Sequence, residues 1–166
     1  MYSNYAKLQQ LQLPKQPYYE TQNTYLLVYA PGRSRALENT LDFQLHRKFR
    51  LVSELGAALT PSVAGVVVVA EDVEFLSTTL SYFAQALQEG SDFAACDAVF
   101  GFEGDTALYR GPKHLAGARC AVLSRGLLEE CRDVGCDLGQ PGALVTLAAG
   151  PAQNPRHMPQ ALLRYP

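Results

Sequence analysis

The chain has 166 residues, of which 48% are hydrophobic and 18% charged, and its net charge is −2. This length suits one domain, and the composition excludes wholesale disorder, which requires low hydrophobicity and a high net charge. No apolar run reaches the roughly 18 residues of a membrane span, and no secretory signal is visible. We therefore expect no membrane association and a location in the cytoplasm or in an assembled particle.

The first part of the chain predicts an arm, a strand and a long helix. Residues 1–23 read as an extended N-terminal arm, because Pro14 and Pro17 interrupt any long helix. The apolar and aromatic run at 24–30 predicts a strand, and Ser34 is a suitable cap for the helix that follows. The helix is predicted by apolar residues at helical spacing, namely Leu37, Leu41, Leu45, Phe49, Val52, Leu55 and Leu59.

The middle of the chain predicts a buried strand, a second helix and a hairpin. Residues 63–70 are apolar on both faces, which is typical of a central strand covered on both sides. Asp72 would cap the second helix, which would end at Gly90. Strand patterns at 96–103 and 106–110 flank a two-residue glycine turn and predict a hairpin.

The last part predicts two strands, a short helix and a second arm. Residues 118–123 predict a strand, Ser124 would cap a short helix, and residues 143–148 predict a final strand. Residues 151–166 hold four prolines and predict a Pro-rich C-terminal arm. The resulting fold class is α/β: a single domain at 24–150 with a mixed, mostly parallel sheet, three helices and the order β-α-β-α-β-β-β-α-β.

Charge is distributed in blocks along the chain. Residues 1–50 carry seven bases and three acids, whereas residues 51–109 carry nine acids and no Lys or Arg. Such blocks would give the folded protein one positive and one negative surface patch. These patches would dock other copies or protein partners, since charge-complementary patches set the orientation in which two proteins bind. The alternative is that acids and bases interleave once the chain folds, because blocks in the sequence need not be blocks on the surface.

The first candidate site is the turn after the first strand. Helix N-termini bind anions, and arginines beside one strengthen that binding. The residues concerned are Gly32, Arg33, Ser34 and Arg35. The turn matches neither of the glycine-rich phosphate-binding motifs, so an ordinary turn with a capping serine is the alternative.

Two further patterns carry charge suited to binding. His46, Arg47, Lys48 and Arg50 form a basic strip on the predicted long helix, which suits an acidic partner or is a solvated face. Its charge is too low to favour nucleic acid.

The acids of the pattern Glu71-Asp72-x-Glu74 follow the central strand, where carboxylates bind Mg²⁺ or act as a base. We expect capping and the helix dipole to account for them instead.

Cysteine chemistry is not indicated. Cys96, Cys120, Cys131 and Cys136 fit no zinc spacing, and we expect reduced, buried thiols. A nucleophile formed by Cys96 with Asp97 and His114 lacks any catalytic signature. We expect no metal, no cofactor and no catalytic residue.

The arms supply the main functional prediction. Tyrosine is enriched at protein interfaces, because it offers a large contact area with few torsions to freeze. The predicted partner-binding residues are Tyr2, Tyr5, Tyr18, Tyr19, Arg47, Lys48, Arg50 and Tyr165.

Three functions follow as hypotheses. The first is a non-enzymatic assembly subunit that docks to itself or to other subunits, as small armed subunits do in rings such as the necks and tails of virions. The second is a small nucleotide- or phosphate-binding enzyme with its site at the first strand-helix turn. The third is an accessory subunit with a degenerate enzyme-like fold in a larger complex.

Overall fold

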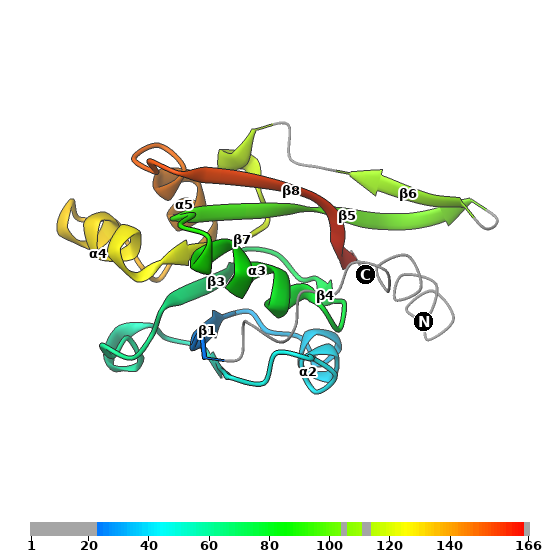
Figure 1. Ribbon diagram of the computed structural model, residues 1–166, viewed down its shortest axis with the longest axis horizontal. Coiled ribbons are helices and arrows are strands. Elements are labelled where there is room, and N and C mark those ends of the chain that lie inside the picture. Colours follow the sequence, from blue (N-terminus) through cyan, green and yellow to red (C-terminus); the bar gives the residue numbers. More distant parts are fainter. Residues whose placement is uncertain (1–22, 104–105, 111–113, 165–166) are drawn as a thin grey trace.

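The computed structural model describes residues 23–103, 106–110 and 114–164 (Figure 1), so the predicted N-terminal arm lies almost wholly outside the described residues. The strands are β1 (Leu26–Tyr29), β2 (Phe49–Val52), β3 (Gly65–Val69), β4 (Glu74–Phe75), β5 (Phe93–Glu103), β6 (Thr106–Arg110), β7 (Cys120–Ser124) and β8 (Pro155–Arg164). The helices are α2 (Arg35–Leu41), α3 (Thr79–Gln88), α4 (Arg125–Asp133) and α5 (Pro141–Ala148), with short 3-10 turns η2 (Gly56–Ala58) and η3 (Leu115–Gly117).

All eight strands belong to one mixed sheet. Its order is β2-β1-β3-β7-β5-β8-β4, and β6 pairs with β5. β1 is parallel to both β2 and β3, and β5 is parallel to β8, whereas the other pairs are antiparallel. The predicted mixed α/β class is confirmed, but the sheet is not mostly parallel and the described chain has four α-helices rather than three.

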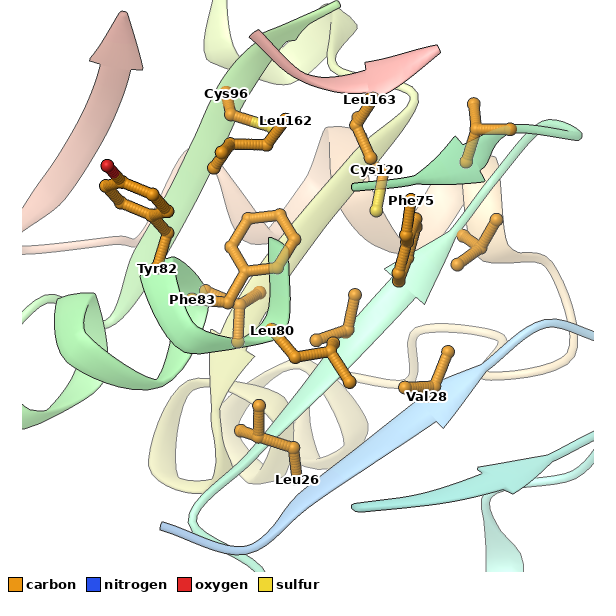
Figure 2. Close-up of a cluster of buried hydrophobic side chains, with 14 of the residues drawn as sticks. Leu26, Val28, Phe75, Leu80, Tyr82, Phe83, Cys96, Cys120, Leu162 and Leu163 are labelled. Atoms are coloured by element: carbon orange, nitrogen blue, oxygen red, sulfur yellow. The ribbon is translucent and has the colours of Figure 1, made fainter. Parts of the chain in front are cut away.

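Helices cover both faces of the central strands. Along β1, Leu26 and Val28 face a core that includes α2 and α3, and Figure 2 shows part of this cluster around Phe83. The alternate residues Leu27 and Tyr29 face a second core that includes α4 and α5. Because β3 is likewise covered on both sides, its apolar run of valines is buried throughout, as predicted.

The predicted long helix from Ser34 to Leu59 is wrong. Helix α2 ends at Leu41, and the chain then forms β2, which pairs with β1 along its outer edge. In β2 the side chains of Phe49 and Leu51 pack on one core and that of Val52 on the other, the alternation of a strand. Apolar spacings of three and four do not reveal that the backbone of β1 needs a hydrogen-bonding partner on that side.

The predicted strand at 143–148 is the helix α5. Pro141 stands at its start, where the fixed φ of proline favours a helix. The buried side chains are Leu144, Val145 and Ala148, which lie on one helical face. Periodicity alone does not separate a short apolar strand from a short buried helix.

The predicted C-terminal arm at 151–166 is also wrong over residues 155–164. These form β8, which runs beside β5 across the molecule (Figure 1) and is antiparallel to β4. Met158, Leu162 and Leu163 are buried in the first core. The register breaks between Met158 and Ala161, so Pro159 sits in an irregularity, where a sheet tolerates proline.

Other predicted elements are confirmed. The hairpin is β5 and β6, which pair up to Glu103 and Thr106, and the strand β7 matches the pattern at 118–123. The side chain of Ser124 caps α4 by accepting the Leu127 N–H. Gly90 has a φ of 92°, the left-handed conformation that glycine provides after a helix.

Gly65 at the start of β3 provides a test of this packing. An added Cβ would lie 2.7 Å from the backbone oxygen of Leu123 in β7 and 2.5 Å from Leu87 Cδ1. We predict that Gly65→Ala lowers the free energy of unfolding by about 1–3 kcal/mol, the usual cost of overpacking. The control is Gly56→Ala, where a Cβ meets nothing within 4 Å. Equal urea midpoints for both variants would contradict the close approach.

Candidate functional site

A crevice lies where the parallel strands β1 and β3 end. The chain leaves β1 to form β2 on one side and then returns to form β3 on the other, so the order β2-β1-β3 has a switch point at β1 and β3. In open α/β sheets, ligands bind outside the carboxyl ends of strands at such a point, because the diverging loops leave a crevice there.

The crevice is a cavity of about 220 Å³ with an apolar floor and a charged rim. The floor includes Ala30, Leu37 and Val69, which are at most 6% exposed, and the charged side chains of the rim are exposed. The lining residues are Ala30, Gly32, Arg33, Leu37, Val69, Ala70, Glu71, Asp72 and Pro141. The floor therefore offers apolar contact and the rim offers charged groups of both signs.

A serine joins the two loops of this crevice. The Ser34 hydroxyl accepts the Leu37 N–H at 3.1 Å, as the predicted cap of α2, and donates to Asp72 Oδ1 at 2.5 Å. The serine and the aspartate are 38 residues apart in the chain. Two patterns that the sequence presents as separate candidates, the turn at 32–35 and the acids after the central strand, therefore meet in one place.

Asp72 does not cap a helix, so that prediction is wrong. Helix α3 begins at Thr79, after the short strand β4, and Thr78 occupies its N-cap position. Asp72 instead stands on the rim of the crevice beside Glu71, whose carboxylate is 2.7 Å from an Arg119 guanidinium nitrogen. The capping role that explained these acids from the sequence does not exist in the fold.

Of the other charged residues in the two patterns, Arg33 lines the crevice, whereas Arg35 and Glu74 do not. Arg33 is on the rim, 3.2 Å from Glu38 in α2, whereas Arg35 is exposed and does not line the cavity. Glu74 is buried in β4 and forms an ion pair with Arg164 of β8 at 3.1 Å. Glu74 therefore links β4 to β8, and it is not one of the residues that line the crevice.

Two adjacent carboxylates stand on the rim of the crevice. Mg²⁺ is commonly held by one or two carboxylates together with the phosphates of a substrate and water, and Glu71 and Asp72 are adjacent exposed carboxylates. Over the described ranges, no group of three or more His, Cys, Asp or Glu side chains could hold a metal by itself. Any ion at this site would therefore need the ligand to complete its coordination.

The basic strip is not on a helix. Arg47 and Lys48 precede β2 and Arg50 lies within it, and all three side chains are exposed at the outermost strand of the sheet order. The Arg47 guanidinium donates to the carbonyls of Asp42 and Gln44. His46 is fully buried, so its place in an exposed strip is wrong.

The cysteine nucleophile finds no support in the geometry. Cys96 is buried in the first core, and burial raises the pKa of its thiol, which disfavours the reactive thiolate. Asp97 pairs with His157 at 2.6 Å, not with His114.

The predicted interface tyrosines Tyr2, Tyr5, Tyr18, Tyr19 and Tyr165 lie outside the described residues.

Comparisons with known proteins add no assignment. No protein-family model matches the chain, and no curated protein matches it significantly. None of the helices in the described part of the chain is long and apolar enough to cross a membrane.

The burial of His46 predicts a pH dependence of stability. Its Nε2 lies 2.8 Å from the Thr24 carbonyl and 3.2 Å from that of Lys48, and Nδ1 is buried without a partner. Burial is the main cause that lowers the His46 pKa, and the Lys48 charge adds to it. Because the unfolded chain then binds the proton more tightly, this contribution to stability is complete above about pH 6.5 and is lost as the pH falls.

We therefore expect the wild-type free energy of unfolding, measured in urea, to be lower at pH 5 than at pH 7.5. His46→Gln keeps a side-chain N–H donor but does not titrate, so the stability of this variant should depend less on pH. The exposed His114→Gln is the control and should behave as the wild type does. Identical pH profiles for all three proteins would contradict a buried neutral imidazole.

Proposed function

We propose that this chain is a small enzyme domain that binds a nucleotide or another phosphorylated small molecule at the first strand-helix turn. The observation that supports this most is the coincidence of three features at one place. These are the switch point of the sheet, a cavity with an apolar floor, and a rim that bears Arg33, Glu71 and Asp72.

The size of the cavity indicates how such a ligand would sit. Pockets that bury a whole drug-sized ligand have volumes of about 300–1,000 Å³, whereas this one has about 220 Å³. A nucleotide would thus place only part of its surface against Ala30, Leu37 and Val69. The remainder would lie along the exposed rim, where its phosphates meet charged side chains.

The charges of the rim favour a phosphate bound together with a cation. Two carboxylates repel a bare phosphate, so Glu71 and Asp72 suit an anionic ligand only when Mg²⁺ stands between them. A bound Mg²⁺ would neutralise charge on the phosphates and stabilise a phosphate leaving group. Arg33 would contact the phosphates directly, and Ser34 would hold the Asp72 carboxylate in position through its hydrogen bond.

The proposal predicts the effect of removing one carboxylate. Nucleoside diphosphates should raise the melting temperature of the full chain when Mg²⁺ is present and should do so less in EDTA. Asp72→Asn should weaken binding about ten- to a hundredfold in calorimetry, the loss of one charge-assisted contact. The control is Glu129→Gln, the same change of carboxylate to amide in a partly exposed pair with Arg125 on α4, and it should bind normally. Binding that is unaffected by Asp72→Asn and EDTA would refute the proposal.

A second candidate function is docking to a protein partner, including another copy of this chain. Its support is the outermost strand β2, which carries the exposed Arg50 and is preceded by the exposed Lys48. Phe43, which is close to them in the chain, is 63% exposed. A large exposed aromatic side chain beside basic residues is typical of an interface, whose partner surface would be acidic.

This second candidate predicts self-association that depends on charge. Sedimentation velocity should show an association of the wild-type chain that increases with protein concentration and weakens at high salt. Arg50→Glu should weaken it roughly three- to tenfold, as for one charge pair of about 1 kcal/mol. Arg132→Glu makes the same change in net charge at an exposed position of α4 and should have no effect. A monomer at every concentration would exclude self-docking.

A further inference from the structure

Two cysteines lie at the C-terminal end of α4, and neither of them lines the crevice. Cys131 is in the last turn of the helix and is 2% exposed, and Cys136 follows the helix and is partly exposed. Both belong to the second core, Cys131 as a buried member and Cys136 packed against it. The sequence spacing alone gives no reason to expect contact between them.

The backbone brings them together through a Schellman motif. The Cys136 N–H donates to the Cys131 carbonyl at 3.0 Å, and the Gly135 N–H donates to the Arg132 carbonyl at 3.0 Å. Gly135 has a φ of 84°, which reverses the chain in the way this motif requires. In a Schellman motif the side chains at these two positions commonly contact each other. A backbone hydrogen bond therefore joins the two thiol-bearing residues directly.

The electrostatics agree with this proximity. Burial raises the pKa of both thiols, and negative charge on Cys136 raises the pKa of Cys131 further. Both groups are therefore protonated at neutral pH, and oxidation should accelerate as the pH rises and more thiolate forms. Cys136 is the more accessible of the two, so it would react first with an oxidant from solution.

We propose that Cys131 and Cys136 form a dithiol that an external disulfide, such as oxidised glutathione, converts into an intramolecular disulfide at the end of α4. The Cys136 thiolate attacks oxidised glutathione, forming a mixed disulfide and releasing one glutathione thiolate. The Cys131 thiolate then attacks the Cys136 sulfur and releases the second glutathione. The protein loses two protons and two electrons, and the glutathione disulfide is reduced to two thiols.

The disulfide would act on the segment that leads to the crevice. Cys136 is followed by Asp137, whose carboxylate accepts the Gly139 N–H at 2.8 Å, and by Leu138, whose carbonyl accepts the Tyr29 hydroxyl at 2.6 Å. The same segment ends at Pro141, which lines the cavity. Cross-linking its first residue to α4 would thus restrict the loop on one side of the crevice, and this holds whatever ligand the crevice binds.

The test is a peptide map of the folded full chain after incubation with oxidised glutathione. The protein is denatured at acidic pH in the presence of a thiol-blocking maleimide, so that buried free thiols are blocked too, and it is then digested with trypsin without reduction. Trypsin cleaves after Arg125, Arg132 and Arg156, so the two cysteines fall on separate peptides, 126–132 and 133–156. We expect these two peptides to be linked, at a rate independent of protein concentration and faster at pH 8.5 than at pH 7.

Matched variants separate this pair from the other cysteines. Cys136→Ser should abolish the linked peptides, whereas Cys120→Ala, which alters a buried cysteine of the first core, should leave them unchanged. Because the linked peptides are read in the wild-type chain, the result does not depend on whether a variant folds. A mixed disulfide with glutathione that persists on Cys136, or blocked thiols at both positions, would overturn the proposal.

Discussion

The burial of β1 and β3 on both faces is the constraint on which the rest of this structure depends. Val66, Val67 and Val68 of β3 are completely buried, so helices must cover both sides of the sheet to keep this apolar surface from water. Helices α2 and α3 pack on one face, and α4 and α5 pack on the other. With both faces occupied, polar chemistry at these strands is confined to the loops at their ends, and the crevice lies there.

Polar contacts tie together the loops at those ends. Ser34 has two roles, since it caps α2 and donates to Asp72 across the crevice. Glu71, the neighbour of Asp72 in the chain, is paired with Arg119. The Ala70 N–H donates to the Arg119 carbonyl at 2.8 Å, and this bond anchors the loop that bears the two carboxylates on the segment before β7. Each rim carboxylate thus has a protein partner that orients it, as the proposed binding of a cation and phosphate would require.

The C-terminal half of the chain extends the sheet and also reaches the crevice from the face of the sheet that α4 and α5 cover. Strand β8 joins β5 to β4, and the partly buried pair of Glu74 with Arg164 links β4 to β8 at the edge of the sheet. On the second face, the end of α4 leads through the segment at 136–140 to Pro141 at the crevice. The two cysteines therefore stand at the start of a segment whose conformation shapes one wall of the cavity.

Local pattern alone was enough for the mixed α/β class, the central strand at 63–70, the hairpin, and the serine caps of α2 and α4. Helix caps, glycine turns and strands that are apolar on both faces depend on residues close together in the chain. They can therefore be recognised from the sequence. Only the tertiary structure decided that residues 49–52 are a strand, that 143–148 are a helix, and that 155–164 belong to the sheet. These segments are short and bury little by themselves, so distant partners select their conformation. The meeting of Ser34 with Asp72 was decided in the same way, because strand order places them side by side.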